Sequence, residues 1–449
     1  MRYTPHTGSD KNRMLQAIGA DQVEELFSHI PQVLRNKAGI SLPPGMSERA
    51  VKRALGALAA RNPTPEEWSF FLGGGIYHHF IPSAVDAVIS RAEFATSYTP
   101  YQPEVSQGTL QATYEYQTLM CQLTGMEVSN AGLYDGASAA AEAVLMARRN
   151  QKGRQRVFLS RALHPQYRQV IATYLKNLAG IEIVEVPWLE TGQSDVEFLE
   201  REMDERAICM VAGYPNFFGV IDDLGPLHGA CAAHGALLIT VTTEALALAL
   251  LKPPGEWGAD LAVGEGQSLG LPMALGGPGF GFFTCLKKFV RTMPGRLVGE
   301  TVDHERRRGF VLTLATREQH IRREKATSNI CTTQSLCTLA ATVFMASLGK
   351  SGIRRLAEIN VARAQGTRER LVAEAGLKPG FSGPVFNEFV LCVENAERTL
   401  RRMEARKIVP GLVLKRWYPA LENALLFCVT EMNEMEEIDR LVGAFTEKN

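Results

Sequence analysis

The stretch ICMVAGYPNFFGVIDDLGPLHGACAAHGALLITV, residues 208–241, decides the fold class of this chain. It begins and ends with short apolar runs, ICMVA at 208–212 and ALLITV at 236–241, which have the length of strands. A helix-length segment at 225–234 separates them. Strands that are apolar on both faces are typical of a parallel sheet covered by helices, because both faces must be shielded from water. The stretch therefore predicts a strand–helix–strand unit of an α/β domain.

The same alternation continues on both sides of this unit. A helix-length segment at 165–178 follows one further strand-like run and precedes another. These additional runs lie at 156–160, 181–186, 259–263 and 279–285. We therefore expect a mainly parallel sheet with helices on its faces.

The two ends of the chain differ from this central part. The first residues have helical patterns, and Pro63 and Pro65 close that region. After the sheet we expect further helices and strands, at 334–349, 352–375, 385–393 and 424–430. The sequence thus predicts three domains, a helical arm at 1–65, a large α/β domain at 66–330 and a smaller C-terminal α+β domain at 331–449.

Composition narrows the class of protein. The chain has 449 residues, 45% of them hydrophobic, and its 48 Lys+Arg balance 48 Asp+Glu. The apolar content argues against disorder, and the balanced charge provides no electrostatic footprint for nucleic acid or an anionic membrane. The cysteines form no CxxC pair and fit reduced thiols. We therefore expect a cytoplasmic protein without nucleic-acid or membrane partners.

Two segments were weighed as targeting or membrane signals. The first residues, MRYTPHTGSDKNRM, lack the apolar core of a signal peptide. The uncharged stretch 326–348 contains many Thr, Asn and Gln side chains, which are too polar for a lipid-facing span. A buried helix is the better interpretation of that stretch.

A glycine-rich segment, LYDGASAAAEA at 133–143, opens an alanine-rich helix. Gly136 allows close backbone approach, and Ser138 lies where the free N–H groups of a helix favour an anion. The segment is either a phosphate cradle or an ordinary helix N-terminus with its cap. It is not a GxGxxG motif, and the chain contains no Walker A pattern.

Histidines offer a second set of candidates. His164 follows the strand-like RVFLS, at the edge where open α/β sheets bind ligands. Its ring could stack on a flat cofactor, or it could be an ordinary loop histidine. His78 and His79 are adjacent, which is the wrong spacing for two ligands on one helix face, so no metal site is expected.

Several long segments together resemble one family. They are TPYQPEVSQG at 99–108, PNFFGVIDD at 215–223, LKPPGEWGADLAVGEGQSLGLP at 251–272, GGPGFGFF at 276–283 and TREQHIRREKATSNICT at 316–332. The chain resembles fold-type I pyridoxal 5'-phosphate (PLP) transferases of the aminotransferase-like class, and specifically subunit 1 of the glycine-cleavage P-protein family. This resemblance implies the decarboxylation of glycine with PLP and transfer of the aminomethyl group to the lipoyl arm of H-protein.

The chain departs from this family's catalytic half at the cofactor. The position that corresponds to the Schiff-base lysine is Gln267, whose amide nitrogen cannot form an imine. Val241, Thr242 and Thr243 stand where the acidic partner of the pyridinium belongs, with Glu244 next. His78 replaces an acid of the usual YDHFIP. We therefore expect Gly136, Ser138, His164 and Gln267 to form a degenerate PLP site without covalent cofactor.

The resemblance then implies an alpha subunit that is inactive alone. Glycine dehydrogenase subunit 2, the beta subunit, would supply the lysine and hold PLP in an alpha2-beta2 assembly. Loops of this chain could complete the partner's site, and the best candidates lie in YTPYQPEVSQ, where prolines stiffen polar and aromatic residues. These candidates are Tyr98, Tyr101, Gln102, Glu104, Ser106 and Gln107. The alternative is an ordinary exposed loop.

A second candidate set combines cations with hydroxyl and amide groups, which could hold a phosphate or carboxylates of the partner. It comprises Arg322, Arg323, Lys325, Thr327, Ser328 and Asn329. A charged helix face is the alternative for this set.

Two rival functions are also open. A self-sufficient PLP lyase would need a lysine such as Lys252, and a purely structural or regulatory homologue would contribute to no active site.

Overall fold

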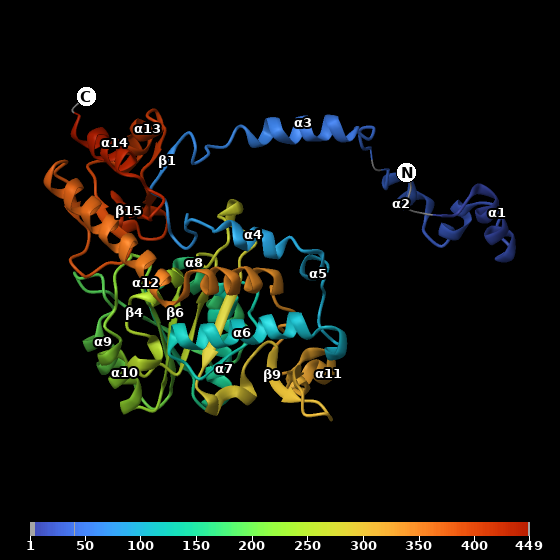
Figure 1. Ribbon diagram of the computed structural model, residues 1–449, viewed down its shortest axis with the longest axis horizontal. Coiled ribbons are helices and arrows are strands. Elements are labelled where there is room, and N and C mark those ends of the chain that lie inside the picture. Colours follow the sequence, from blue (N-terminus) through green and yellow to red (C-terminus); the bar gives the residue numbers. More distant parts are fainter. Residues whose placement is uncertain (1–4, 40, 448–449) are drawn as a thin grey trace. The chain divides into compact units, whose positions relative to one another are not determined.

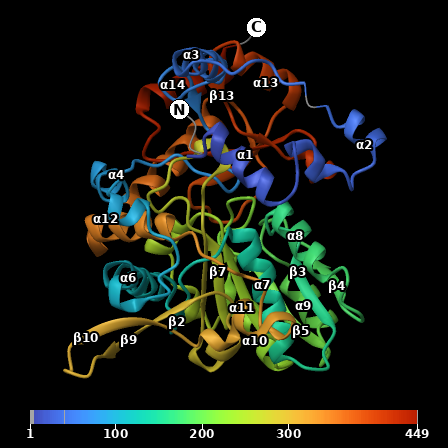
Figure 2. The same ribbon diagram turned by 90° about the vertical axis from the view of Figure 1, so that its right-hand side faces the viewer.

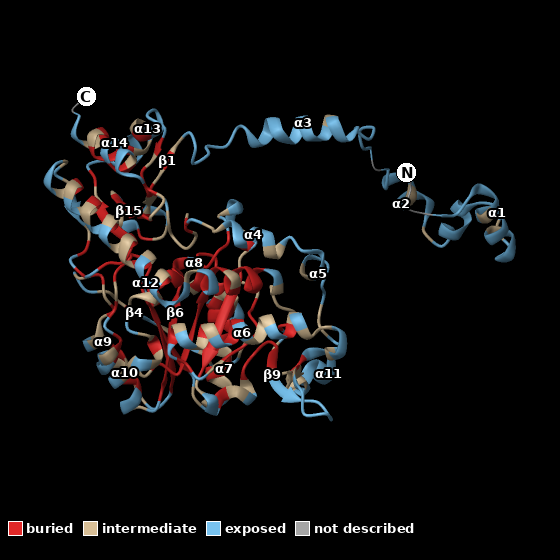
Figure 3. Cartoon of the chain, in the orientation of Figure 1, coloured by how far each residue is buried: buried red, intermediate tan, exposed pale blue. Residues whose placement is uncertain are grey.

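The computed structural model describes residues 5–39 and 41–447, which divide into two compact units, Met1–Thr64 and Pro65–Asn449. In the first unit Ser47 caps the longest helix, accepting a hydrogen bond from the Ala50 N–H at Oγ. None of the described residues of this unit is buried, as the pale blue of α3 illustrates (Figure 3). The helices are α1 (Gly8–Ala17), η1 (Val23–Phe27), α2 (Gln32–Lys37) and α3 (Glu48–Ala59).

The second unit is built on a seven-stranded sheet with the strand order β2-β8-β7-β6-β5-β3-β4. The pairs from β4 through β7 are parallel, whereas β8 is antiparallel to both β7 and β2. The predicted mainly parallel sheet is therefore confirmed. Its strands are β2 (Val128–Ser129), β3 (Arg156–Ser160), β4 (Glu182–Val186), β5 (Ala207–Gly213), β6 (Leu237–Thr242), β7 (Leu261–Glu265) and β8 (Gly281–Cys285).

Helices cover both faces of this sheet (Figures 1 and 2). Neighbouring residues of β3 show why, because Val157 and Leu159 pack with α7 and α8 while Phe158 packs with the helices of the opposite face. These buried strands stand out in red in Figure 3. The helices are α6 (Gln107–Thr124), α7 (Gly136–Asn150), α8 (Pro165–Leu175), α9 (Val196–Glu202) and α10 (Leu224–Ala233), with α4 (Ser83–Ile89) and α5 (Ala92–Ala95) before them.

The C-terminal part forms a second, four-stranded antiparallel sheet with the order β11-β12-β15-β14. Its core includes Phe389, Phe427 and Leu441. The expected α+β character of this part is confirmed. Its elements are β11 (Lys378–Pro379), β12 (Glu388–Cys392), α13 (Ala396–Glu404), β14 (Leu412–Val413), β15 (Ala424–Cys428) and α14 (Met435–Thr446), and β1 (Ser69–Phe70) pairs in parallel with β13 (Ile408–Val409) nearby.

One long helix, α12 (Ser335–Ala373), connects the two cores. Phe344 packs in the large core and Leu371 in the C-terminal one. The sequence predicted two helices here, and the helix indeed has a break in its backbone angles at Gly349. Because this helix contributes to both cores within one compact unit, the predicted domain boundary at 331 stays a prediction.

Among the described residues, α12 is the one helix long and apolar enough, by length and composition, to cross a membrane. Half of its most apolar window is buried inside the chain. Its packing against α4 and α6 is typical of a core helix.

The sequence did not lead us to expect the antiparallel hairpin of β9 (Leu297–Val302) and β10 (Arg308–Thr313). Most of its residues are exposed or half-buried. Its strands therefore lack the continuous apolar runs by which the central strands were recognised. The hairpin packs on α6 and supports the loop before that helix through Gln107 and Phe310.

Candidate functional site

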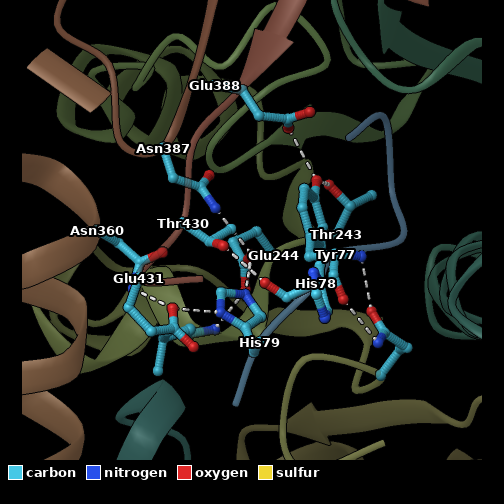
Figure 4. Close-up of polar contacts among 12 residues, drawn as sticks. Tyr77, His78, His79, Thr243, Glu244, Asn360, Asn387, Glu388, Thr430 and Glu431 are labelled. Atoms are coloured by element: carbon cyan, nitrogen blue, oxygen red, sulfur yellow. Dashed lines mark hydrogen bonds and ion pairs between the residues drawn. The ribbon is translucent and has the colours of Figure 1, made fainter. Parts of the chain in front are cut away.

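Three of the residues noted in the sequence lie at the carboxyl ends of the parallel strands. His164 follows β3, Glu244 follows β6 and Gln267 follows β7. The segment 73–80 passes along this edge and contacts residues that flank β12 and β15 of the C-terminal sheet (Figure 4). This is the edge of an open α/β sheet where ligands bind, so the chain places its candidate pocket where the fold predicts it.

Gln267 is buried, and both ends of its side-chain amide are used. Its Oε1 accepts from the Tyr77 N–H at 2.9 Å, and its Nε2 donates to the carbonyl oxygens of Tyr77 at 3.0 Å and Leu271 at 2.8 Å. The amide thus pairs with the backbone of Tyr77 in both directions. At this position the chain ties segment 73–80 to the sheet and offers no amine for an imine.

The N-terminus of α7 is the predicted phosphate position, and two carboxylates occupy its N–H groups. Asp135 is the N-cap and accepts from the Ser138 N–H at 2.8 Å and from the Ser138 hydroxyl at 3.0 Å. Glu265 accepts from the Gly136 N–H at 2.9 Å and from the Phe280 N–H at 3.0 Å. The N-cap interpretation left open by the sequence is thus the one that the geometry supports.

Glu265 and Gly136 also show how closely this corner is packed. Burial raises the pKa of Glu265 to about 7, although the N–H groups around it favour its charged form. A Cβ added at Gly136 would lie 2.3 Å from the Tyr167 hydroxyl and 2.7 Å from the Glu265 nitrogen. Only glycine therefore fits at the start of this helix.

His164 is a buried member of an aromatic group. Its Nδ1 accepts from the Gln166 N–H at 3.2 Å, which leaves Nε2 to donate to the Gly74 carbonyl at 2.9 Å. The rings of Tyr167 and Phe217 lie 4.9 Å and 4.7 Å from it, centroid to centroid. Burial lowers the pKa of His164 to about 4, so the ring is neutral near pH 7. The predicted role of His164 in stacking on a cofactor therefore stays a prediction.

The centre of the pocket is a buried histidine held between two carboxylates. His79 Nε2 lies 2.9 Å from Glu244 Oε2, and Nδ1 lies 2.9 Å from Glu431 Oε2 (Figure 4). Burial alone would lower the pKa of His79, but the two carboxylates outweigh it and raise the pKa to about 10. His79 is therefore an imidazolium near pH 7, and it joins the end of β6 to the segment after β15.

Amides and backbone groups complete this network. Asn387 donates to Glu244 at 3.0 Å, and Asn360 donates to Glu431 at 2.9 Å. The remaining oxygen of each carboxylate accepts a backbone N–H, from Leu246 at 3.0 Å for Glu244 and from Phe80 at 2.7 Å for Glu431. Each carboxylate is therefore satisfied within the chain, as buried charges require.

A second buried pair lies beside the histidine. The Tyr77 hydroxyl donates to Glu388 Oε2 at 2.8 Å and lies 3.3 Å from Thr243 Oγ1. The other oxygen of Glu388 accepts from the Gly74 N–H at 2.6 Å. Burial raises the pKa of Glu388 to about 7. Segment 73–80 is thus bonded to both sheets through its backbone and its side chains.

These residues do not fit PLP. The cofactor's phosphate needs free N–H groups at the helix N-terminus, and there Glu265 and Asp135 already accept those of Gly136 and Ser138 and would repel an anion. Its aldehyde needs a lysine, and Gln267 stands at the predicted position with both ends bonded. Lys252, the lysine of the rival lyase hypothesis, is exposed, with Nζ 3.8 Å from the ring centroid of Trp257. This chain's pocket is filled by its own side chains.

Sequence reasoning noted Glu244 and His78 as departures and missed the role of His79. His78 is half-buried, and burial lowers its pKa, whereas its neighbour His79 forms the ion pairs. Glu431 could not be anticipated, because it lies more than 350 residues along the chain from its partner. The sequence held one signal of this ion pair, namely the two adjacent histidines in YHHFIP together with Glu244, an acid in an otherwise apolar region.

The loop 98–107 lies away from this network and is mostly exposed. Tyr98 is 79% exposed and Tyr101 is 59% exposed. Gln102 and Glu104 are exposed, and Ser106 is half-buried. Gln107 anchors the end of the loop, because its Nε2 donates to the carbonyls of Pro103 and Phe310 while its Oε1 accepts from the Phe310 N–H at 2.8 Å.

The second candidate set forms short turns beside this loop. Arg322, Arg323 and Lys325 are exposed around α11 (Gln319–Arg322) and η8 (Arg323–Lys325). Thr327 N–H donates to the Arg317 carbonyl at 3.1 Å, Ser328 Oγ accepts from the Ile330 N–H, and Asn329 is exposed. His320 of α11 lies edge-on to Tyr101, with ring centroids 6.4 Å apart. The two candidate sets, distant in sequence, therefore meet in space.

The fold itself defines the class. A sphingosine-1-phosphate lyase from Burkholderia pseudomallei matches with a TM-score of 0.65 over 91% of this chain and 92% of its own, at 18% identity. A cysteine desulfurase from Escherichia coli matches with a TM-score of 0.63 at 14% identity, over 87% of this chain and 96% of its own. These likenesses show the fold alone, that of the fold-type I PLP-dependent enzymes.

Closer relatives define the family. The family model of the glycine cleavage system P-protein matches residues 1–445. A probable glycine dehydrogenase (decarboxylating) subunit 1 from Anaeromyxobacter dehalogenans is 51% identical over 99% of each chain. A crystal structure of glycine decarboxylase (P-protein) in inhibitor-bound form matches with a TM-score of 0.90 and 43% identity, over 99% of each chain. This chain belongs to the glycine cleavage system P-protein family.

Proposed function

We propose that this chain is the alpha subunit of a two-subunit glycine decarboxylase of the glycine cleavage system. With a beta subunit it releases CO2 from glycine and transfers the aminomethyl group to the lipoyl arm of H-protein. The observation that carries the proposal is the family match over residues 1–445 in a chain whose candidate pocket holds Gln267 in place of a lysine.

The division of labour follows from this pocket. PLP supplies an electron sink for decarboxylation and needs an amine to hold it. The beta subunit therefore holds the cofactor covalently. The two kinds of subunit form an alpha2-beta2 assembly, which is located in the cytoplasm. The carboxylates of Glu265 and Asp135, which accept the Gly136 and Ser138 N–H groups of α7, support this division, because they occupy the predicted phosphate position.

The alpha subunit contributes the loop 98–107 to the partner's site. Tyr101, Gln102 and Glu104 are exposed there, and the loop is anchored at Gln107. A phenol, an amide and a carboxylate together can donate and accept hydrogen bonds and can pair with a cation. Such groups on an anchored loop are suited to orient a small zwitterion such as glycine and to exclude water from it.

The first test concerns the division of labour. The purified chain alone is expected to show no glycine-dependent exchange of carboxyl carbon with bicarbonate, and exchange should appear on addition of the beta subunit. A stable internal aldimine band that stays with the isolated chain after free PLP is removed, or exchange by the chain alone at the rate of the mixture, would contradict the proposal.

The second test concerns the loop. In the complex, Tyr101→Phe, Gln102→Ala and Glu104→Ala are each expected to lower the exchange rate by about 10²- to 10³-fold, the range for a group that acts in the transition state. Tyr174→Phe on α8 and Glu200→Ala on α9 are matched controls that should leave the rate unchanged. Wild-type rates in all three loop variants would favour the rival proposal of a structural or regulatory homologue.

The exposed cations Arg322, Arg323 and Lys325, with Thr327 and Asn329, are proposed to contact acidic groups of the beta subunit. Lys325→Glu should then weaken subunit association, and added salt should reduce the difference from the wild type. Association that is indifferent to both changes would remove this segment from the interface.

A further inference from the structure

Arg296 is a buried arginine just before β9, and its guanidinium joins the two candidate sets. Its Nη1 donates to the Thr99 hydroxyl at 3.1 Å, at the start of the exposed loop. Its Nη2 donates to the Cys331 carbonyl at 2.7 Å, at the end of the second candidate segment. Its Nε lies 3.6 Å from the Glu318 carboxylate, which is also buried. One side chain thus links segments that are separated by more than 190 residues.

The arginine is itself held firmly by the large core. Its carbonyl accepts from the Ala131 N–H at 2.9 Å, close to strand β2. On either side of it, Leu297 is a core residue of β9, and the Gly295 carbonyl accepts from Arg317 at 3.1 Å. The guanidinium is therefore presented from a rigid base, and it can impose a position on a loop that has few contacts of its own.

The same guanidinium lies against an aromatic ring of the loop. Its central carbon is 5.9 Å from the ring centroid of Tyr101, within the range of a cation–π contact. The Tyr101 ring also meets the edge of His320. With Gln107 fixing the far end of the loop to β10, Arg296 is the anchor at its near end. Tyr101, Gln102 and Glu104 lie between the two anchors.

Burying a guanidinium is costly, and here Nη1 and Nη2 are hydrogen-bonded to Thr99 and Cys331 while Nε, without a hydrogen bond, faces the Glu318 carboxylate. Only the planar fork of arginine can donate to Thr99 and Cys331 while facing Glu318, because a lysine ammonium has a single charged centre. A loop that merely closed the surface would not need a buried ion pair at its base. The arrangement is suited to holding the loop in one conformation.

We propose that Arg296 is a positioning residue for the decarboxylation, which sets the conformation of loop 98–107 in the partner's active site through Thr99 and Tyr101. This inference rests on the proposed function. Arg296 contacts no substrate itself. A shift of about 1 Å in groups that orient a reactant costs on the order of 10²-fold in rate, so the loss of its fork should lower kcat strongly.

The test uses the complete complex and two pairs of variants. Arg296→Lys is expected to lower kcat for the exchange reaction by about 10²-fold with subunit affinity unchanged. Its matched control is Arg156→Lys, a buried arginine of β3 with ion pairs to Glu182 and Asp204 at the other side of the sheet. The control should lose thermal stability while keeping kcat and the KM for glycine.

The second pair isolates the hydrogen bond and applies even where Arg296→Lys fails to fold. Thr99→Val should lower kcat about tenfold, because it removes the hydroxyl that Arg296 holds, and Thr99→Ser should restore the wild-type value. A wild-type kcat in Thr99→Val, or an equal loss in Thr99→Val and Thr99→Ser, would overturn the inference. So would a loss in Arg296→Lys confined to melting temperature.

The Tyr101, Gln102 and Glu104 variants distinguish the role of Arg296 from the role of the loop itself. Rate losses in those variants, with wild-type kcat in Arg296→Lys and Thr99→Val, would overturn the role of Arg296 and leave the proposed function standing. Wild-type rates in the loop variants themselves would overturn the proposed role of the loop, and the inference with it, while the family match stands.

Discussion

The candidate pocket and the loop 98–107 use the same kinds of side chain in opposite circumstances. The pocket contains Tyr77, Gln267 and Glu244, and the loop contains Tyr101, Gln102 and Glu104. Tyr77 is 1% exposed and Tyr101 is 59% exposed. The pocket groups bond to one another and to the backbone, whereas within the described chain no hydrogen bond joins the side chains of Gln102 or Glu104 to another residue.

This contrast indicates which side chains keep groups that a substrate could use. A buried polar group that is fully bonded stabilises one structure and has no bonding capacity left for a substrate. An exposed group on an anchored loop keeps that capacity and can use it on a partner. The exposed loop therefore keeps hydrogen-bonding capacity that the buried pocket has used up.

The largest effect is expected from breaking the pocket's ion pairs. His79→Gln leaves Glu244 and Glu431 buried without their shared cation, which should destabilise the chain by about 3–5 kcal/mol in denaturant unfolding. His78→Gln is the matched control, because the His78 side chain is only half-buried and lies outside the ion pairs of His79 with Glu244 and Glu431. Equal losses in both variants would contradict the central role assigned to His79.

The second-largest loss of stability is expected from a substitution at Gly136, the first residue of α7. Gly136→Ala would push a methyl group against Tyr167 and the Glu265 backbone, at a cost of about 1–3 kcal/mol. The control is Gly229→Ala in α10, where an added Cβ meets nothing within 4 Å. Replacing glycine inside a helix there should raise stability by about 0.4–1 kcal/mol. A neutral Gly136→Ala would mean that the corner is looser than described.

The free energy of unfolding, measured against pH, tests the charge on His79 in the pocket. The folded pKa of His79 is raised to about 10 from an ordinary 6.5, so its contribution is fully present below pH 6.5 and is lost as pH rises through 10. The stability gap between the wild type and His79→Gln should therefore narrow across this window. Groups remote from His79 titrate equally in both proteins and cancel in the difference, whereas Glu431, whose pKa His79 lowers, does not. A gap that stays constant would show that the ring is not charged in the folded state.

The smallest effect is expected in the loop. Tyr98→Phe, Gln102→Ala and Glu104→Ala should each change the stability of the isolated chain by no more than about 0.5 kcal/mol, since these side chains are exposed. Thermal melting of the isolated chain checks this. A loss comparable to that of Gly136→Ala would identify the loop as structural and would remove the contrast with the pocket.

Sequence reasoning reached the fold because the information was local. Buried strands such as 208–212 and 236–241 are apolar on both faces, and that pattern is visible in the chain itself. The hairpin of β9 and β10 escaped, because its half-exposed residues have no such pattern. Periodicity detects burial, and it fails where burial is partial.

The candidate site divides in the same way. Three features can be read directly from the sequence. They are the glutamine at position 267 in place of a lysine, the polar character of YTPYQPEVSQ, and the segments that carry the family resemblance. The three-dimensional fold was needed to show that His79 meets Glu244 and Glu431, that Glu265 accepts the N–H of Gly136, and that Arg296 joins Thr99 to Cys331. The physical reason is that ion pairs and hydrogen bonds depend on distances of about 3 Å between atoms far apart in the chain, and no local pattern encodes them.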